Sequence, residues 1–205
     1  MTPEIYVPPL LCLLFGYVLG SVPFGLLLTR AAGLGDVRAI GSGNIGATNV
    51  LRTGRKGLAA ATLLLDAGKG AAAVALAGLI WPDLPQAGVI AGIGAFLGHL
   101  YPVWLRFRGG KGVATLAGIV GALHWPSLVV AALVWLLVVL ITRYSSLGGI
   151  LAPAATPISA ALLDRYDLAM LFFGFALLVL WTHRANVGRL LDGTEAKVGG
   201  KAKVG

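Results

Sequence analysis

Long runs of hydrophobic residues, separated by short polar stretches rich in glycine and basic residues, make up most of this chain. A helix needs about 20 consecutive apolar residues to cross the hydrocarbon core of a bilayer. On that pattern we predict seven membrane-embedded helical segments: Ile5 to Leu28, Leu58 to Trp81, Gln86 to Leu105, Val113 to Leu123, Ser127 to Thr142, Leu147 to Leu163 and Leu168 to His183. The fourth is short and the sixth contains prolines, so five spans is the minimum if both are re-entrant. Gly20, Ser21 and Pro23 predict a kink in the first segment.

The composition favours a membrane protein over a soluble one. Of the 205 residues, 58% are hydrophobic and 12% are charged, whereas a soluble domain carries about 25% charged residues. We therefore predict an all-α integral membrane protein, a bundle of seven transmembrane helices forming a single domain over residues 1–205, with residues 193–205 as a cytoplasmic tail. Met1 to Tyr6 contains no basic residue, so the run from Ile5 is interpreted as a mature helix and not as a removed signal peptide.

The basic residues predict the orientation of the chain, because loops rich in lysine and arginine stay in the cytoplasm. With seven spans, the loops after the first, third, fifth and seventh spans hold most of these residues: Arg30, Arg38, Arg52, Arg55, Lys56, Arg106, Arg108, Lys111, Arg143, Arg184, Arg189, Lys197, Lys201 and Lys203. The N-terminus is therefore expected outside and the C-terminus in the cytoplasm. The net charge of +8 suggests anionic lipids and phosphorylated substrates as partners, and no nucleic acid, since the aromatic residues lie in the apolar runs.

The first polar stretch that suggests chemistry runs from Gly41 to Arg52. It contains the form G-x-G-x-x-G, but a dinucleotide site also needs a preceding strand and a βαβ unit, which an all-helical membrane protein lacks. Glycine backbone N–H groups followed by a helix N-terminus can instead bind an anion. The candidate binding residues are Gly41, Ser42, Gly43, Asn44, Thr48, Asn49 and Arg52. The alternative is a flexible polar loop.

The second stretch, Arg106 to Thr115, follows the third predicted span. It is not a Walker loop, because Leu105 stands where that motif requires its first glycine. Gly-Gly-Lys-Gly at the start of an apolar helix nevertheless suits a phosphate, with the lysine as a point charge. The candidate residues here are His99, Gly109, Gly110, Lys111 and Gly112. The alternative, in which the basic residues only anchor the loop at the membrane, does not explain the glycines.

The third stretch begins at the end of the last predicted span. At helical spacing His183, Asn186 and Arg189 share one face, and Glu195 follows. We predict catalytic roles for His183 and Asn186, as for Arg52 and Lys111, and substrate binding by Arg189 and Glu195. The alternative is a polar helix end with a basic tail, and we expect the segment from Lys197 to be disordered. Upstream, Ser145 and Ser146 stand at the start of a span, where either serine caps the helix or contacts an anion.

Asp66 and Lys69 lie three residues apart inside the second predicted span. Charged side chains at that depth are usually paired or functional, so they are either a mutually neutralising pair or part of a site. No metal or cofactor is predicted, because the three histidines have no carboxylate at ligand spacing and the single cysteine, Cys12, lies in an apolar run.

Taken in order, these three stretches resemble the PlsY family of bacterial membranes, the acyl-phosphate:glycerol-3-phosphate acyltransferases. The resemblance covers almost the whole chain and implies seven helices in the bacterial cytoplasmic membrane, with an active site facing the cytoplasm. It implies transfer of a fatty acyl group from acyl phosphate to the sn-1 hydroxyl of glycerol 3-phosphate, giving lysophosphatidic acid and phosphate for phospholipid synthesis. A soluble enzyme that makes acyl phosphate is then a possible partner. By motif, Ser42, Arg52, Lys111, His183 and Asn186 line the substrate site, and Ser146 matches a serine motif whose second serine is replaced by Gly149.

The residues themselves agree with this chemistry. Both substrates carry phosphate, and Arg52, Lys111 and Arg189 can neutralise it. The His-x4-Asp signature of acyl-CoA-using acyltransferases is missing after each of the three histidines, which argues against acyl-CoA as the donor. We expect positioning and electrostatics to supply the catalysis, with a substrate phosphate oxygen or His183 taking the hydroxyl proton. The main alternative is a transporter of a small phosphorylated anion, which is favoured by the position of Asp66 and Lys69 inside the second predicted span.

Overall fold

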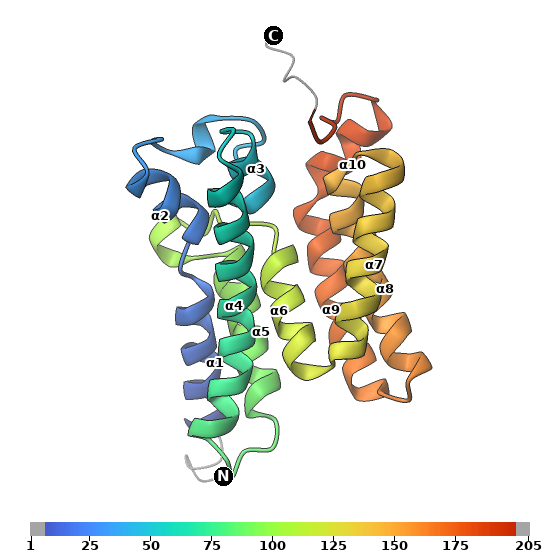
Figure 1. Ribbon diagram of the computed structural model, residues 1–205. Helices are drawn as coiled ribbons and strands as arrows, with labels where there is room; N and C mark the ends of the chain where they lie inside the picture. Colours follow the sequence, from blue (N-terminus) through green and yellow to red (C-terminus); the bar gives the residue numbers. More distant parts are fainter. Residues whose placement is uncertain (1–6, 200–205) are drawn as a thin grey trace. The chain divides into compact units, whose positions relative to one another are not determined.

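The computed structural model describes residues 7–199, which are helical with no strand in that range (Figure 1). The α-helices are α1 (Val7–Gly20), α2 (Phe24–Ala31), α3 (Ala47–Leu51), α4 (Lys56–Ile80), α5 (Ala87–Leu100), α6 (Val113–Leu123), α7 (Trp125–Thr142), α8 (Ser145–Leu162), α9 (Tyr166–Thr182) and α10 (Arg184–Leu191). Two short 3-10 helices are η2 (Val37–Ala39) and η3 (Val103–Leu105). The all-α prediction is confirmed, while the expectations for Met1 to Tyr6, Lys201 and Lys203 lie outside the described residues.

Membrane-spanning length is reached by five helical segments within residues 7–199: Val7–Ala31, Lys56–Ile80, Ala87–Leu105, Trp125–Thr142 and Ser145–Leu162. A sixth is reached if α9 and α10, which are bent by 60° at their junction, form one span. The remaining apolar helix, α6, has 11 residues and is about 17 Å long, against a hydrocarbon core of about 30 Å. A count of seven spans therefore remains a prediction.

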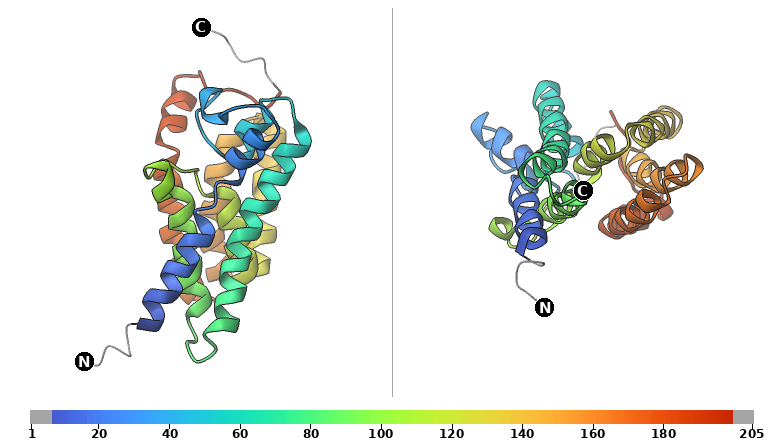
Figure 2. Two further views of the ribbon diagram at one scale, coloured as in Figure 1. Left: turned by 90° about the vertical axis from the view of Figure 1, so that its left-hand side faces the viewer. Right: turned by 90° about the horizontal axis from the view of Figure 1, so that it is seen from below.

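The chain divides into two compact units, Met1–Leu123 and His124–Gly205. In the first unit α1 packs chiefly against α5, and α4 packs against both α5 and α6 (Figures 1 and 2). Because α4 and α5 run in opposite directions, the segments before α4 and after α5 lie at the same end of this unit. Both glycine-rich stretches that the sequence singled out in this half of the chain are in those segments.

Close packing between α1 and α5 depends on glycine. A Cβ atom on Gly16 or Gly20 would overlap the backbone of α5, and a Cβ atom on Gly94 or Gly98 would overlap the backbone of α1. Small residues four apart let two helices approach until their backbones touch, which replaces the hydrophobic driving force that is missing inside a bilayer. These glycines therefore set the position of α5, whose C-terminal end carries the second candidate stretch.

The predicted kink in the first span is confirmed, since α1 ends at Gly20 and α2 begins at Phe24. Pro23 has no N–H group to continue the helix. The backbone carbonyl of Val22 at this break accepts a hydrogen bond of 2.7 Å from the Lys69 ammonium group of α4. The break is thus tied to the buried charged pair that the sequence placed inside the second span.

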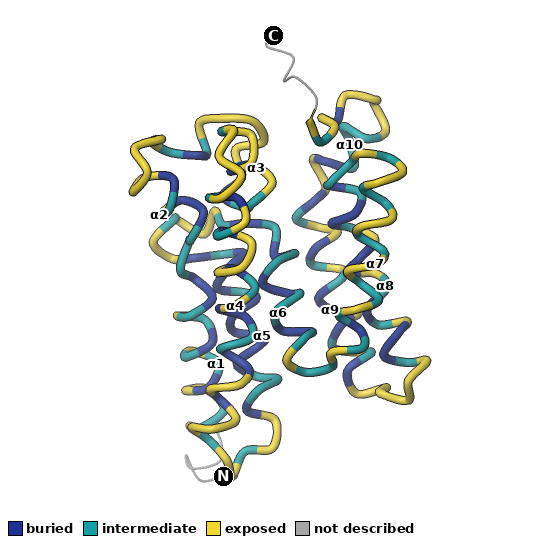
Figure 3. The backbone as a smooth tube through the Cα atoms, viewed as in Figure 1, coloured by how far each residue is buried: buried dark blue, intermediate teal, exposed yellow. Residues whose placement is uncertain are grey.

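In the second unit α8 packs against both α7 and α9. Within α7 the one buried residue is Ser127, and the rest of that helix is partly or fully exposed (Figure 3). An apolar helix with an uncovered surface suits contact with lipid chains. Ser127 accepts a hydrogen bond of 2.8 Å from the Ser159 hydroxyl of α8, so its buried hydroxyl joins the two helices.

Candidate active site

The first candidate stretch is built around the buried side chain of Asn49, which is 2% exposed. Its amide nitrogen donates to the backbone carbonyl oxygens of Val37 at 2.8 Å, Ile40 at 3.1 Å and Asn44 at 2.8 Å. Val37 belongs to η2, whereas Ile40 and Asn44 lie outside the helices, where buried polar groups often need a partner from a side chain. Asn49 therefore organises the loop rather than standing at its surface.

The amide oxygen of Asn49 gathers the polar groups at the exposed side of the same loop. It accepts from the Ser42 backbone N–H at 3.1 Å, from the Ser42 hydroxyl at 3.4 Å and from the Arg52 guanidinium at 3.3 Å. Gly41 has φ of +55°, and a Cβ atom there would overlap the Arg52 side chain. The structure thus brings an exposed hydroxyl and an exposed guanidinium together, a combination suited to a phosphate group.

The other candidate residues of this loop have different surroundings. The Asn44 side-chain oxygen accepts from the Gly46 backbone N–H at 2.9 Å, so it shapes the turn before α3. Gly43 and Thr48 are exposed. Since α3 contains five residues, its dipole is smaller than a long helix would provide, and the anion-binding capacity predicted here rests on side chains more than on a helix terminus.

The second candidate stretch folds back against the end of α5. Arg106 and Phe107 both have left-handed backbone conformations, with φ of 52° and 61°, and reverse the chain after η3. The Gly109 N–H then donates to the Leu100 carbonyl and the Gly110 N–H to the His99 carbonyl, each at 3.0 Å. These bonds satisfy carbonyl groups that a helix terminus would otherwise leave without partners.

The glycines in this stretch are required by close packing. A Cβ atom on Gly110 would overlap Nε2 of His99, and one on Gly112 would overlap the Phe96 ring. Gly112 also has φ of +86°, a conformation that costs little only for glycine. Lys111 is half-buried between them. Anchoring at the membrane would need none of these contacts, so the structure favours the interpretation in which the loop presents Lys111 in a fixed position.

Beneath this loop lie Asp66 and Lys69, whose pairing is confirmed by an N–O distance of 2.7 Å. Asp66 Oδ1 is also 3.7 Å from Nδ1 of His99. His99, predicted to bind substrate, is 4% exposed and lies below the loop rather than at its outer side.

In the second unit the buried carboxylate of Glu195 gathers the third candidate stretch. It accepts from the Asn186 amide at 2.7 Å and from Nε of Arg189 at 2.6 Å. Burial raises the pKa of Glu195, but interactions with Ser146, Asn186 and Arg189 outweigh it, so the pKa lies below its ordinary value of 4.5. Asn186, Arg189 and Glu195, which are close in sequence, therefore meet here with Ser146 from the start of α8.

His183 lies at the 60° bend between α9 and α10 and is 3% exposed. Its Nδ1 is 2.8 Å from the Val179 carbonyl oxygen. A carbonyl oxygen only accepts hydrogen bonds, so Nδ1 carries the hydrogen and the neutral ring has its lone pair at Nε2. His183 is the N-cap residue of α10, and Asn186 and Arg189 lie within that helix.

The structure contradicts two expectations about this region: disorder at residues 197–199 and a serine cap at the start of α8. Residues 197–199 are ordered: the Val198 N–H donates to the Arg143 carbonyl at 2.8 Å, the Arg143 guanidinium donates back to the Val198 carbonyl at 3.0 Å, and the Lys197 ammonium lies 5.4 Å from the centre of the Tyr144 ring. Neither Ser145 nor Ser146 caps α8, whose N-cap residue is Tyr144. Arg143 is left-handed with φ of 63°, which leaves so tight a turn that both serines are already inside the helix.

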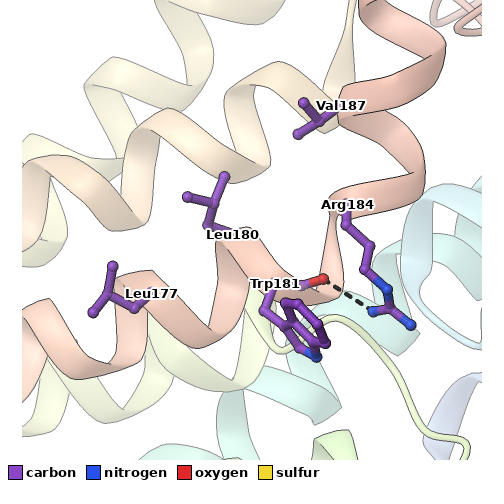
Figure 4. Close-up of a pocket in the computed structure, with 5 residues that line it drawn as sticks. All are labelled: Leu177, Leu180, Trp181, Arg184 and Val187. Carbon is purple, nitrogen blue, oxygen red and sulfur yellow. Dashed lines mark hydrogen bonds between the residues drawn. The ribbon is translucent and has the colours of Figure 1, made fainter.

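An open apolar hollow lies at the junction of α9 and α10 (Figure 4). It is lined by Leu177, Leu180, Trp181, Arg184 and Val187. The Arg184 guanidinium is 4.8 Å from the centre of the Trp181 ring and donates to the Trp181 carbonyl at 3.0 Å. A cation beside an apolar surface suits a molecule with a hydrocarbon chain and an anionic end.

Residues 10–193 match the family described as glycerol-3-phosphate acyltransferase. The chain belongs to this acyltransferase family. It is 59% identical to the glycerol-3-phosphate acyltransferase of Mesorhizobium japonicum, over 94% of this chain and 97% of that protein. It is 54% identical to the enzyme of the same name from a Bradyrhizobium species, over 98% of this chain and 100% of that protein.

Solved structures agree with the family. The chain is similar to a crystal structure of PlsY (YgiH), an integral membrane glycerol 3-phosphate acyltransferase, in its glycerol 3-phosphate form. The TM-score is 0.86 and the sequence identity is 34%, and the match covers 92% of this chain and 94% of that one. The lysophosphatidic acid form of PlsY gives a TM-score of 0.84 at 33% identity. The predicted resemblance to PlsY is confirmed, and the protein is an integral membrane acyltransferase that acts on glycerol 3-phosphate.

Sequence reasoning missed two residues that shape the acyltransferase's loops. Asp36 binds both Arg30 and Arg38, and hydrogen bonding from Arg38 holds the pKa of its carboxyl well below the usual range. Phe96 packs against Gly112. The spacing of Phe96 and His99, three residues apart on one helix, could have indicated that both face the same loop. Asp36 is the N-cap residue of η2 and accepts from the Arg38 N–H, a role for which aspartate is favoured.

Proposed function

We propose that the acyltransferase uses acyl phosphate as its donor and transfers the fatty acyl group to the sn-1 hydroxyl of glycerol 3-phosphate. The products are lysophosphatidic acid, for phospholipid synthesis, and inorganic phosphate. The observation that carries the proposal is the family match over residues 10–193, which includes two glycine-rich loops that each present a basic side chain, Arg52 and Lys111. Two phosphorylated substrates require at least two such groups.

The choice of donor rests on what the enzyme has to supply. Acyl phosphate is already activated, so the acyl group needs no covalent enzyme intermediate. Cys12 does not suit that role, because its buried thiol donates to the Ala87 carbonyl at 3.0 Å between α1 and α5. No histidine of the chain has an aspartate five residues later, since Trp104, Val129 and Gly188 occupy those positions.

In the proposed arrangement the first loop holds the acceptor and the second holds the donor. Ser42, Asn44 and Arg52 bind glycerol 3-phosphate, with Asn49 fixing the loop geometry described above. Lys111 binds acyl phosphate and stabilises the charge of the departing phosphate, while the Gly109 and Gly110 N–H groups fix the loop by donating to carbonyls at the end of α5. Preorganised donors are effective because they need no rearrangement as the charge develops.

The acyl-transfer step balances without any further reactant. The sn-1 oxygen attacks the acyl carbonyl carbon, the bond from that carbon to the phosphate oxygen breaks, and phosphate leaves with the electron pair. The hydroxyl proton passes to a phosphate oxygen or to Nε2 of His183, the nitrogen left as an acceptor when Nδ1 donates to Val179. Near-normal turnover and an unchanged pH profile in His183→Ala would eliminate the histidine version.

We also propose the topology that the basic residues predict: seven segments in the bacterial cytoplasmic membrane, the N-terminus outside, and the active site with the C-terminus in the cytoplasm, as a single domain. It is supported in each unit separately. In the first unit, the segments before α4 and after α5 carry basic residues at one end. In the second, Arg143 and Arg189 flank the junctions at one end of the helices. A soluble enzyme that makes acyl phosphate could then deliver it from the cytoplasm.

The deciding experiment is phosphate release from palmitoyl phosphate by purified protein in lipid, with and without glycerol 3-phosphate, beside a palmitoyl-CoA control. Release that requires glycerol 3-phosphate and yields lysophosphatidic acid supports the proposal. Lys111→Ala is expected to lower turnover by at least about 100-fold, whereas Lys56→Ala, an exposed lysine at the start of α4, is expected to leave it unchanged. Turnover with palmitoyl-CoA instead would overturn the donor assignment. The transporter alternative gains nothing from the comparisons, which name acyltransferases.

A further inference from the structure

Three polar side chains lie buried among the first unit's helices, away from the loop surfaces: Asp66 is 2% exposed, Lys69 is 6% exposed and His99 is 4% exposed. Charged groups within a membrane-embedded bundle are costly to bury. The reaction proposed above uses neither Asp66 nor Lys69. Their presence at this depth therefore calls for an explanation, and their contacts suggest a role.

Lys69 ties α4 to the break in the first span. Its ammonium group lies 2.7 Å from Asp66 Oδ1 and donates to the Val22 carbonyl at 2.7 Å. It also lies 5.7 Å from the centre of the Phe24 ring. Mutual neutralisation would need only the first of these contacts, so the pair does more than cancel its own charge.

Asp66 in turn faces His99 on α5. The distance from Asp66 Oδ1 to Nδ1 of His99 is 3.7 Å, and within residues 7–199 this Nδ1 has no hydrogen-bond partner. A carboxylate beside a ring nitrogen favours the orientation in which the N–H points toward it. The opposite edge of the ring then faces the glycine-rich loop.

The loop rests on His99 through both backbone and side chain. The Gly110 N–H donates to the His99 carbonyl at 3.0 Å, and the space a Cβ atom of Gly110 would need is filled by Nε2 of the His99 ring. Lys111 is the next residue. A rotation of the His99 ring would therefore displace the backbone on which Lys111 is mounted.

We propose that Asp66, Lys69 and His99 are positioning residues, which hold the segment from Gly109 to Lys111 in the geometry needed for catalysis. They do so through consecutive contacts, in the order Val22, Lys69, Asp66, His99 and Gly110. None of the three touches substrate in this proposal. Its consequence for catalysis rests on the proposed role of Lys111, since misplacing a group by about 1 Å can slow a reaction about 100-fold.

The principal test replaces both charges at once with Asp66→Leu/Lys69→Met. Removing one partner alone leaves an unpaired buried charge and endangers folding, whereas an apolar pair of similar volume is often neutral or stabilising. We expect this variant to be folded, with kcat for glycerol 3-phosphate acylation about 100-fold lower and KM for glycerol 3-phosphate little changed. Ser159→Ala, which breaks a buried hydrogen bond to Ser127, is the control for general destabilisation and should leave kcat unchanged.

Hydrogen–deuterium exchange of residues 106–113 in lipid nanodiscs measures how firmly the loop is held. It needs no acyl donor, so it is independent of the proposed reaction. Faster exchange there in the folded double variant supports the positioning role, and exchange equal to that of the wild type overturns it. Faster exchange with unchanged kcat would support positioning while overturning the proposed role of Lys111, so the two proposals fail separately.

A second test uses the contact between Gly110 and the His99 ring. Gly110→Ala should lower kcat because its methyl group displaces that ring, and the exchange of residues 106–113 should rise. Combining it with His99→Gly removes the obstruction, so the double variant should be more active than Gly110→Ala alone. A double variant whose losses are the product of the two single losses would show that the ring and the loop are not coupled.

Discussion

Asn49 in the first unit and Glu195 in the second both collect polar groups around one buried side chain, but they collect different kinds. Asn49 binds three backbone carbonyls with its nitrogen and binds Ser42 and Arg52 with its oxygen. Glu195 interacts only with side chains among the groups described above: it accepts from Asn186 and Arg189, and Ser146 also interacts with it. The neutral amide therefore fixes the path of the chain, whereas the carboxylate fixes side chains on a helix that is already formed.

Because of this difference, we expect the two regions to respond differently to substitution of the central side chain and to changes of pH. A loop without regular structure loses its geometry when its central hydrogen bonds are removed, because no helix or strand holds the carbonyls in place. The side chains on α10 keep their backbone when Glu195 is changed, and lose only orientation and charge balance. An amide is also insensitive to pH, whereas a carboxylate is not.

Asn49→Ala is expected to have the largest effect. It leaves the carbonyls of Val37, Ile40 and Asn44 without their side-chain donor and should cost about 3 kcal/mol of stability, while displacing Arg52 and lowering acyltransferase turnover about 100-fold. Thermal unfolding in detergent and turnover with glycerol 3-phosphate measure the two effects. Arg55→Ala, an exposed neighbour, is the control, and a stable, active Asn49→Ala would remove the central role assigned to this side chain.

Glu195→Gln should have a smaller effect, a fall in turnover of about tenfold, corresponding to about 1.4 kcal/mol. The amide still accepts from Asn186 but no longer balances the charge of Arg189, whose side chain is 39% exposed and partly stabilised by water. Glu195→Ala, which removes both interactions, should be slower than Glu195→Gln. Equal turnover in the two variants would show that the charge, and not the geometry, is what matters.

Lowering the pH is expected to have the smallest effect of the three changes, and it should affect the region around Glu195 but not the region around Asn49. The pKa of Glu195 is lower in the folded protein than its ordinary value of 4.5, so its stabilising contribution is complete above that value and is lost as the pH falls through the folded pKa. Hydrogen–deuterium exchange, corrected for the intrinsic pH dependence, should therefore rise in residues 193–199 as the pH falls below 4.5. The loop around Asn49 should show no such rise, and a rise in both would contradict the comparison.

The sequence predicted the helices well and the contacts between them poorly. The bounds of Val113–Leu123 are as predicted, because the length of an apolar run largely determines a membrane helix. The pairing of Asp66 with Lys69 was also accessible, since residues three apart on a helix are neighbours. The contact between His99 and Gly110 was not, because it depends on how the chain turns back after η3.

The same limit applies to the candidate site. Asn49 was predicted as a substrate ligand because polar residues in a glycine-rich loop suggest binding, and Glu195 because it ends the third stretch that resembles the family. In the structure both are largely occupied by protein groups. Sequence spacing gives the chemical types present in a loop, but which of them points inward depends on backbone turns that a local pattern does not determine.

The pairing of α1 with α5 has a consequence for biosynthesis. A membrane protein is inserted from its N-terminus, and the glycines of α1, Gly16 and Gly20, fit against a helix that begins only at Ala87. Helix α1 is therefore translated before its main partner, which is complete only at Leu100. During that interval its glycine surface is open to other small-residue helices in the membrane, so quality control of this enzyme should depend most on how quickly α5 follows.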